Sequence, residues 1–493
     1  MLTITHDTQL AAVDLGSNSF RLEIGRVVDG QILRVDYLKE AVRQGGDLDE
    51  DRNLKPEAFE RGLKCLARFG ERLKGFPAEQ VRAVATQTLR EAVNSDDFIR
   101  QAQKILGYPI EIISGVEEAR LIYQGVSRML SQSDEKRLVI DIGGRSTEFI
   151  LGQHFKANTT ESLRLGSVGW SQKYFADGQL SERNFERAEI AAESIIDMIG
   201  NRYASNQWEV AYGASGTVGA VADVLAGAGF PADKIEREQL DWLKQTLIKA
   251  KTPERLTMEG LKEDRRAVIG GGLAVLTAVF DTLGIQTMHV AYGALRHGVL
   301  YDMLSPEHAT EDLRSASIAR LCKQFSVDME HAQNVSKVAL YFYDAMQASD
   351  THKPLLQWAA LCHEIGWLIS HTDCNKHGAY ILENTELMGF AQSELHTISL
   401  LVMGHQGKLR KLAADFDNQN LVCQLMALRL AVIFCHSRRM PAIKHLQLAR
   451  HKQQFTLTFP AQWETQHPQT RYLLEEECQL WQKLGWQLET RQA

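Results

Sequence analysis

The chain lacks the features that mark membrane-spanning and secreted proteins. Its longest apolar stretches, such as residues 267–280, are interrupted by glycines and fall short of a bilayer-spanning helix. Residues 1–10 contain no basic segment followed by an apolar one, so we expect no secretory signal. The seven cysteines form no C-x-x-C pair, which favours free thiols over a disulfide framework or a zinc site. These absences predict a cytoplasmic protein without stable membrane insertion.

An excess of positive charge is also missing. The sequence has 55 Lys and Arg against 62 Asp and Glu, a net charge of −7, so we expect no general attraction to polyanions and no nucleic-acid binding. An anionic substrate would need a local basic patch. One run without acidic residues offers such a patch, although a solvated basic face is an equal alternative: Arg438, Arg439, Lys444, Arg450 and Lys452.

At 493 residues the chain is too long for one hydrophobic core. Strand-like and helix-like segments alternate in the first half, and residues 310–435 are almost entirely helical in pattern. Strand-like alternation returns at residues 454–459. We therefore predict an α/β first half made of two related domains, followed by a mostly helical second half, with domains at residues 1–120, 121–305, 306–450 and 451–493.

Two segments of the first half share one pattern, in which an apolar strand ends in Asp and is followed by a glycine turn with hydroxyl residues. Strands predicted at residues 9–15 and 20–27 enclose the first turn, and strands at 138–142 and 148–151 enclose the second. Glycine allows backbone N–H groups to approach a phosphate closely. The pattern predicts a two-sided phosphate clamp made by Gly16, Ser17, Asn18, Ser19, Gly143, Gly144, Ser146 and Thr147.

Carboxylates accompany both turns. Asp14, Asp141 and Glu148 provide hard oxygen ligands of the kind that Mg²⁺ prefers, directly or through water. Hydrolysis of a phosphoanhydride requires such charge stabilisation together with an oriented water molecule. Two ordinary hairpins with Asp for local hydrogen bonding are the alternative, which the repetition of the pattern disfavours.

The duplicated Asp-x-Gly hairpin resembles the actin, Hsp70 and sugar-kinase superfamily. Six segments in order are similar to a narrower group, the exopolyphosphatase / guanosine pentaphosphate phosphohydrolase family: VDLGSNSFR, ATQTLR, ISGVEEARLIYQGV, DIGGRSTEF, GASGT and YGALRHGVLY. The resemblance covers the whole chain, including the helical second half of the long bacterial members. It is far more specific than one glycine loop.

The resemblance implies that Glu118, at the start of a predicted helix, is the base that activates water. The neighbouring Glu117 competes for this role, because sequence alone does not separate residues about 100° apart on a helix. Both acids would also suit the positive end of the helix dipole.

Further phosphate contacts are implied for Arg90 and predicted for Arg21, which alternates with apolar residues on its strand. A surface ion pair is the alternative for each. The turn with Gly213, Ser215 and Gly216 should line the distal cleft, where superfamily kinases hold adenosine, or act as a structural turn. Arg145 departs from the family pattern, which has a third glycine or an alanine there, and would contact phosphate, narrow the loop or point to solvent.

The helical half resembles the HD phosphohydrolase fold in a degenerate form. Histidines stand at plausible metal-ligand positions, but the His-Asp pair is His363-Glu364 and Val432 replaces the final Asp. The other positions are His331, His377 and His405. We expect this module to serve dimer contacts and polyanion binding rather than a dinuclear metal site.

The resulting hypothesis is a Mg²⁺-dependent exopolyphosphatase that releases terminal orthophosphate from inorganic polyphosphate by attack of water. The closest alternative is removal of the 5′-terminal phosphate of guanosine pentaphosphate (pppGpp), or both activities. An actin-like ATP-binding scaffold and a kinase are less favoured. The resemblance further implies a homodimer and activation by a monovalent cation such as K⁺.

Overall fold

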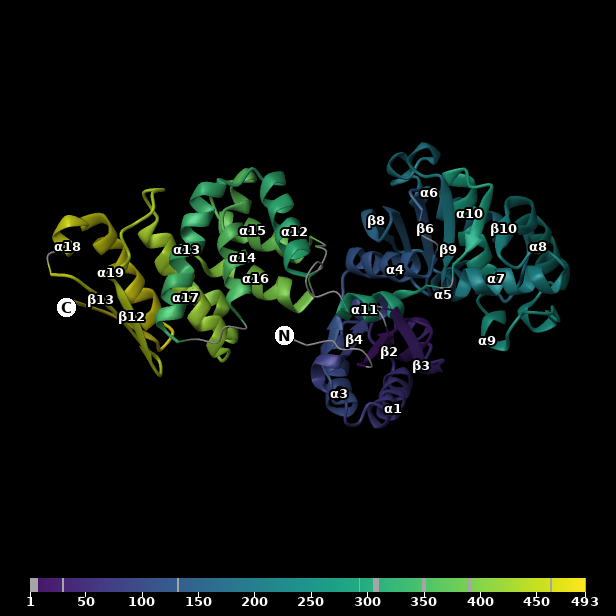
Figure 1. Ribbon diagram of the computed structural model, residues 1–493, viewed down its shortest axis with the longest axis horizontal. Helices are drawn as coiled ribbons and strands as arrows, with labels where there is room; N and C mark the ends of the chain where they lie inside the picture. Colours follow the sequence, from purple (N-terminus) through teal and green to yellow (C-terminus); the bar gives the residue numbers. More distant parts are fainter. Residues whose placement is uncertain are drawn as a thin grey trace. The chain divides into compact units, whose positions relative to one another are not determined.

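The computed structural model describes residues 8–28, 31–130, 133–291, 293–304, 310–347, 352–385, 387, 390, 392–461 and 463–492. The chain divides into two compact units, residues 1–309 and 310–493 (Figure 1). The predicted boundaries at residues 120 and 450 fall inside these units and stay predictions, and the boundary near residue 305 lies outside the described residues.

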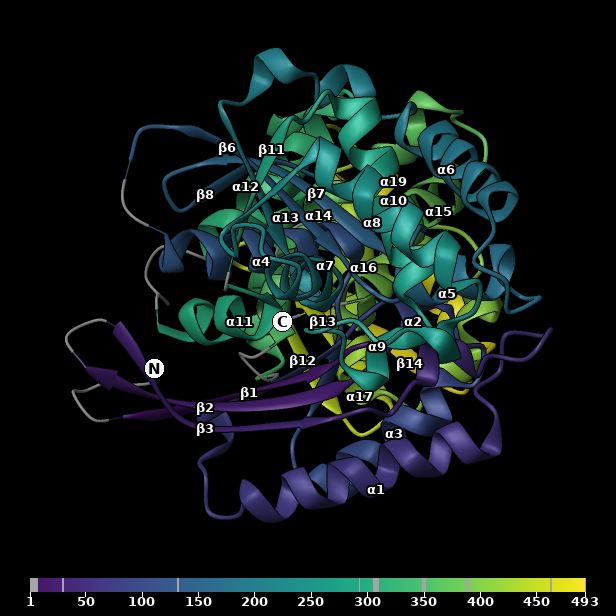
Figure 2. The ribbon, with the colours of Figure 1, turned by 90° about the vertical axis from the view of Figure 1, so that its right-hand side faces the viewer.

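The first sheet of the first unit has five strands in the order β3-β2-β1-β4-β5. The first three strands are antiparallel, and β4 and β5 continue the sheet in parallel. Helices α1 and α3 cover one face (Figure 2), where the strand residues Val13 and Leu15 pack against Leu66 and Phe98. The elements are β1 (Gln9–Leu15), β2 (Phe20–Val28), β3 (Gln31–Glu40), α1 (Pro56–Arg72), β4 (Val81–Ala85), α2 (Gln87–Glu91), α3 (Ser95–Leu106), β5 (Ile110–Ile112) and α4 (Gly115–Met129).

The second sheet has six strands in the order β10-β11-β9-β6-β7-β8. Its elements are β6 (Lys136–Ile142), β7 (Thr147–Gln153), β8 (Lys156–Leu163), α5 (Ser167–Tyr174), α6 (Glu182–Ile196), β9 (Val210–Ala214), α7 (Ser215–Gly227), β10 (Lys234–Glu236), α8 (Arg237–Ala250), α9 (Glu263–Arg266), α10 (Ile269–Leu283), β11 (Thr287–Val290) and α11 (Leu295–Leu304). A helix is predicted over residues 182–203, but α6 ends at Ile196 and a short 3-10 turn follows at Gly200–Arg202.

The two sheets repeat one hairpin with the same register. Asp14 pairs with Arg21 across β1 and β2, and Asp141 pairs with Glu148 across β6 and β7. In both turns the glycine after the strand approaches the carbonyl oxygen three residues later, so an added Cβ would lie 3.1 Å from it at Gly16 and 3.0 Å at Gly143. Glycine is favoured at both positions because a Cβ would force the turn to shift by a few tenths of an ångström. The predicted duplicated α/β architecture of the first half is confirmed.

Helices α4 and α11 occupy the space between the two sheets. Helix α11 packs on β1 and β2, α4 packs on β7 and β8, and the helices contact each other. They cross closely at small residues: a Cβ at Gly298 would lie 1.8 Å from the carbonyl oxygen of Leu121. The two helices therefore join the two sheets through one continuous packed layer.

The second unit is mostly helical, as predicted, with one core that includes Phe342, Leu401 and Trp481. A three-stranded sheet, ordered β12-β13-β14, closes it. Its elements are α12 (Thr310–Gln324), α13 (Met329–Ala345), α14 (Lys353–Cys362), α15 (Cys374–Glu383), α16 (Gln392–Gly404), α17 (Gln419–Phe434), β12 (Gln447–His451), β13 (Gln454–Phe459), α18 (Trp463–Gln466), α19 (Pro468–Gln482) and β14 (Gln487–Gln492). Among the described residues, no helix combines the length and apolar character that crossing a bilayer requires.

Candidate active site

The two hairpin turns face each other across one cleft of about 430 Å³ in the first unit. Their approach is close: a Cβ at Gly144 would lie 3.1 Å from the Cβ of Ser17 and 3.7 Å from the backbone nitrogen of Asn18. The predicted phosphate-clamp residues that line the cleft are Gly16, Ser17, Asn18, Ser19, Gly143, Gly144 and Ser146. Donors from both sheets therefore converge on one cavity.

Four buried carboxylates line the same cleft. Asp14 and Asp141 are the next-to-last residues of β1 and β6, Glu148 is the second residue of β7, and Glu118 lies in the first turn of α4. Burial, together with the negative charge of Glu118, raises the pKa of Asp141 to about 7. The pKa of Glu148 is raised well above its ordinary value by burial and by the charges of Glu118 and Asp141.

This donor set fits a divalent cation. Asp141 and Glu148 are hard oxygen ligands, and their raised pKa values show that the protein alone leaves negative charge poorly compensated. Asp14 differs, because Arg21 donates to its carboxylate at 3.1 Å. Asp141 and Glu148 are therefore residues that could hold a cation, whereas the Asp14 carboxylate already accepts from Arg21.

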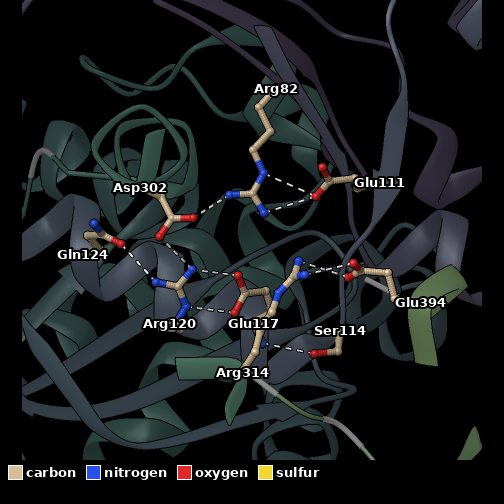
Figure 3. A network of polar contacts seen from close by, with 9 residues as sticks. All are labelled: Arg82, Glu111, Ser114, Glu117, Arg120, Gln124, Asp302, Arg314 and Glu394. Carbon is tan, nitrogen blue, oxygen red and sulfur yellow. Dashed lines mark hydrogen bonds and ion pairs between the residues drawn. The ribbon is translucent and has the colours of Figure 1, made fainter. Parts of the chain in front are cut away.

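The side chains of Glu117 and Glu118 make different contacts, although the two residues are neighbours in the sequence. The hydroxyl of Ser114 caps α4 by accepting from the backbone N–H of Glu117 at 3.2 Å. The Glu117 carboxylate accepts two hydrogen bonds from Arg120, at 2.7 and 2.8 Å, whereas Glu118 lines the cleft. Arg120 also donates to Asp302 of α11 at 2.9 Å, so Glu117 belongs to the buried network between α4 and α11 (Figure 3).

Arg90 does not line the cleft. Its guanidinium donates to the carbonyl of Ile113 at 2.6 Å and to a carboxylate oxygen of Glu118 at 3.0 Å. The side chain therefore lies behind Glu118, because protein acceptors hold it there. Arg90 thus contacts the Glu118 carboxylate directly, and its implied phosphate contact stays a prediction.

Two other predicted phosphate ligands also lie outside the cleft lining. The hydroxyl of Thr147 is buried and donates to the carbonyl of Leu165 at 2.6 Å. Gly213 lies within β9, where an added Cβ would meet the sulfur of Met288 at 2.5 Å. Both residues serve local packing in the second sheet. Ser215 and Gly216, which follow at the start of α7, do line the cleft.

Four cations of the cleft were not predicted from the sequence: Lys39, Lys262, Arg265 and Arg296. Lys39 lies directly opposite Arg21 in the β2–β3 pair. Burial and the charge of Arg265 lower the pKa of Lys39, and burial lowers the pKa of Arg265. Like charges placed together in this way indicate a site for an anion. Only Arg296 carried a signal in the sequence, since it lies in the YGALRHGVLY segment.

Arg145 spans the two halves of the cleft. Its Nε donates to Glu91 at 2.9 Å, and a terminal nitrogen donates to the carbonyl of Gly45 at 2.7 Å. Both acceptors belong to the first half, whereas Arg145 follows β6. Two of its five guanidinium N–H donors are therefore directed at the opposite half of the cleft rather than at solvent.

The second unit contains one further cluster of ligand-type residues. His331, His363 and Glu364 each place a ligand atom within 4.8 Å of the others. The cluster as found in the described residues does not include His377 or His405, although the His405 ring lies 5.3 Å from that of His363. Arg438 donates to both oxygens of Glu364, at 3.0 and 2.8 Å, so a guanidinium already neutralises the only carboxylate. This contact also removes Arg438 from the predicted basic patch.

Comparisons with known proteins agree with this geometry. The sequence profile of the Ppx/GppA phosphatase family matches residues 24–307, and that of Ppx/GppA phosphatase domain III matches residues 313–478. A solved Ppx/GppA family member from Aquifex aeolicus is 23% identical, with a TM-score of 0.53, and 62% of this chain and 99% of that chain are covered.

Two other solved structures give a similar result. An exopolyphosphatase from Cytophaga hutchinsonii is 24% identical, with a TM-score of 0.53, covering 60% of this chain and 98% of that chain. An exopolyphosphatase-like protein is 24% identical, with a TM-score of 0.55 and the same coverage. At these identities the structures establish the fold alone. The family profiles, which together match most of the sequence, show that this chain belongs to the Ppx/GppA phosphatase family.

Proposed function

We propose that this phosphatase is an exopolyphosphatase, which hydrolyses the terminal phosphoanhydride of inorganic polyphosphate and releases orthophosphate. The observation that carries the proposal is the position of Glu118, whose carboxylate lines a cleft walled by two glycine turns from different sheets. The similar protein from Cytophaga hutchinsonii is named an exopolyphosphatase, which supports the same substrate class. Polyphosphate combines a high density of negative charge with a chain end that such a cleft can enclose.

The terminal phosphoryl group is held by donors from both halves in this mechanism. Backbone and hydroxyl groups of Ser17, Asn18 and Ser146 donate to its oxygens, and Arg21 and Lys39 provide positive charge. Developing negative charge on the bridging oxygen is stabilised by the same donors. The clamp therefore fixes the reacting phosphorus and resists its displacement during attack.

Glu118 accepts the proton of the attacking water in this mechanism. Arg90 donates to one oxygen of its carboxylate at 3.0 Å and thereby fixes its orientation. The water oxygen bonds to the terminal phosphorus as the bridging P–O bond breaks, and the shortened polyphosphate leaves as an anion. Asp141, Glu148 and Asp14 are the proposed holders of Mg²⁺, which when bound neutralises phosphate charge.

Replacement of Glu118 with Gln tests the assignment of the base. The amide keeps the size of the side chain but accepts no proton at the reacting position, so we expect phosphate release to fall at least about 100-fold. Binding of polyphosphate, measured by titration, should remain. Glu161→Gln is the matched control, since Glu161 lies on β8 and forms an ion pair with Arg202 outside the cleft. Near-normal release by the Glu118 variant would overturn the assignment.

Guanosine pentaphosphate is the second candidate substrate. The cleft continues beyond the turns along α7, where Gly219, Ala220 and Asp223 line it. This space beside small side chains offers room for a nucleoside behind the phosphates. A comparison of kcat/KM on long-chain polyphosphate and on guanosine pentaphosphate, with one preparation, distinguishes the candidates. A strong preference for the nucleotide would reverse our ranking.

The same preparation tests the other proposed properties. Free phosphate from polyphosphate without an acceptor argues against a kinase and against an ATP-binding scaffold. Dependence on Mg²⁺ and activation by K⁺ can be followed in that assay, and light scattering gives the mass of the proposed homodimer. A cytoplasmic location is proposed from the sequence and can be tested by cell fractionation.

A further inference from the structure

Arg145 begins an unbroken series of polar contacts that ends at Glu118. Arg145 donates to Oε2 of Glu91 at 2.9 Å, and Oε1 of the same carboxylate accepts from the side-chain amide of Gln87 at 2.7 Å. The carbonyl oxygen of Gln87 accepts from the guanidinium of Arg90 at 2.7 and 3.2 Å. Arg90 then donates to Glu118 at 3.0 Å. We call these five residues the Arg145–Glu118 chain.

The hydrogen bonds of the Arg145–Glu118 chain allow one orientation of the Gln87 side-chain amide. A carboxylate accepts and a guanidinium donates, so the nitrogen of Gln87 must face Glu91 and its oxygen must face Arg90. The side chain of Glu91 is 9% exposed, and those of Arg90 and Glu118 are 8% and 10% exposed. Contacts between charged groups are strong and directional in so buried a setting. Each member therefore limits the freedom of the next.

The Arg145–Glu118 chain also joins the two halves of the cleft. Arg145 belongs to the turn after β6, whereas Gln87, Arg90 and Glu91 all lie on α2 in the first half. The contact of Arg145 with the Gly45 carbonyl, at 2.7 Å, fixes its guanidinium on the same side. The turn that carries half of the phosphate clamp is thus linked to the proposed base through side chains alone.

We propose that Arg145 is a positioning residue, which couples the contact between the two halves of the cleft to the orientation of the Glu118 carboxylate. The proposal rests on the proposed role of Glu118 as the base. Arg145 holds Glu91, Glu91 holds Gln87, and Gln87 holds the guanidinium that orients Glu118. Misplacement of a reacting group by a small distance lowers the rate of the chemical step while substrate binding is retained.

Replacement of Arg145 with Ala tests the coupling. We expect kcat for phosphate release to fall about tenfold and KM to change less than about twofold, because the phosphate-binding groups stay in place. Arg145→Lys should recover part of the loss, since its ammonium can still donate to Glu91. Unchanged kcat in Arg145→Ala would overturn the proposal, and so would a raised KM with unchanged kcat, which indicates a phosphate contact.

Two control variants separate coupling from simple contact between the halves. Gln172 also crosses the cleft, donating to the carbonyl of Gly46 at 2.8 Å, but contacts no member of the chain through that bond. Arg164 lies 3.6 Å from Glu91, and its side chain is 75% exposed. We expect Gln172→Ala and Arg164→Ala to keep kcat within about twofold. A loss in either control as large as that in Arg145→Ala would contradict the specific role of Arg145.

A double-mutant cycle provides the sharper test. Gln87→Met interrupts the same chain at its centre, so the variant with both Arg145→Ala and Gln87→Met should be no slower than the slower single variant. Independent roles would instead multiply the two losses and overturn the proposal. Glu118→Gln, measured alongside, keeps the two hypotheses apart. Retained turnover in that variant refutes the base itself, whereas its loss with a fast Arg145→Ala variant refutes only the coupling.

Discussion

Lys39 and Arg21 bring two positive charges together in the cleft, as binding of an anionic substrate requires. They lie opposite each other on antiparallel strands, where like charges destabilise a sheet, and Arg265 adds a third positive charge nearby. Burial, and then the charges of Arg265 and Arg21, lower the pKa of Lys39. Asp14 and Asp264 compensate these charges in part, and phosphate oxygens would compensate them further when an anion enters.

Replacing Lys39 with Met should therefore weaken substrate binding without harming the fold. We expect KM for polyphosphate to rise about tenfold, equivalent to ~1.4 kcal/mol of lost binding free energy, and kcat to change little. Steady-state kinetics measure this effect, and thermal denaturation should show an unchanged or slightly raised Tm. Lys64→Met is the control, since Lys64 is exposed and pairs with Glu60 on α1. Equal KM values for both variants would contradict the anion site.

Asp141 makes stability depend on pH in a predictable direction. Its pKa is raised to about 7 in the folded protein, mainly by burial. The folded state therefore holds a proton that the unfolded chain releases near pH 4, so this contribution is present below about pH 4 and is lost as the pH rises through 7.

The variant Asp141→Asn has no such proton, so its advantage should grow with pH. We expect its stability relative to the natural protein, measured in a chelator, to rise by on the order of 1–3 kcal/mol between pH 5 and 8. Thermal denaturation at both pH values gives the difference. A difference independent of pH would show that another residue carries the proton.

Helices α4 and α11 set the distance between the two sheets. Their crossing brings Gly298 against the backbone of Leu121 and Gly125 against that of Ala294, where an added Cβ would lie 1.8 and 2.4 Å from carbonyl oxygens. The network of Arg120 with Glu117 and Asp302 joins the same helices (Figure 3). Since Glu118 lies on α4, the crossing also sets the position of the proposed base.

We expect Gly298→Ala to destabilise the first unit by about 1–3 kcal/mol, because the backbone must separate to admit the methyl group. Gly169→Ala is the matched control. Gly169 lies in α5, and no neighbouring atom comes within 4 Å of the place where an added methyl group would lie, so this change should stabilise the helix by about 0.5–1 kcal/mol. Thermal denaturation measures both changes, and equal Tm shifts would contradict a tight crossing.

The helices and strands also show which features the sequence could predict and why other features could not be predicted. The two hairpins were predictable because apolar strands and glycine turns are local signals, and the register of β1–β2 recurs in β6–β7. Neighbours such as Glu117 and Glu118 could not be separated, since Arg120 and Asp302 decide their directions through tertiary contacts. The position of Lys39 in the cleft could not be predicted for the same reason, because its place beside Arg21 depends on strand register. The contacts of Arg90 with a backbone carbonyl and with Glu118 were not visible in the sequence, and its implied phosphate contact stays a prediction.

The whole molecule consists of two units, each with its own core. The complete cleft, with both turns and all four carboxylates, lies in the first unit. A unit with its own core and site can fold and act by itself. The second unit provides helices, a small sheet and a His–Glu cluster neutralised by Arg438, and its proposed roles are dimer contacts and polyanion binding.

A fragment of residues 1–309 should therefore retain phosphate release from short substrates. We expect kcat on tripolyphosphate within about threefold of that of the full chain, and a larger loss of kcat/KM on long polyphosphate. Circular dichroism verifies that the fragment is folded before phosphate release is measured. A folded fragment without activity on tripolyphosphate would show that the second unit takes part in the chemistry.

The opposed charges of the cleft have a thermodynamic consequence. Asp141 and Glu148 are stabilised when a cation arrives, whereas Lys39 and Arg265 are stabilised when an anion arrives. A bound cation reduces the repulsion among the carboxylates, and a bound anion reduces the repulsion among the cationic side chains. Each bound ion also lowers the electrostatic cost of binding the other. By linkage, the affinity for the divalent cation must then rise with the occupancy of phosphate, and the reverse by the same factor. The cleft therefore binds the divalent cation and the phosphate together more favourably than it binds either ion alone.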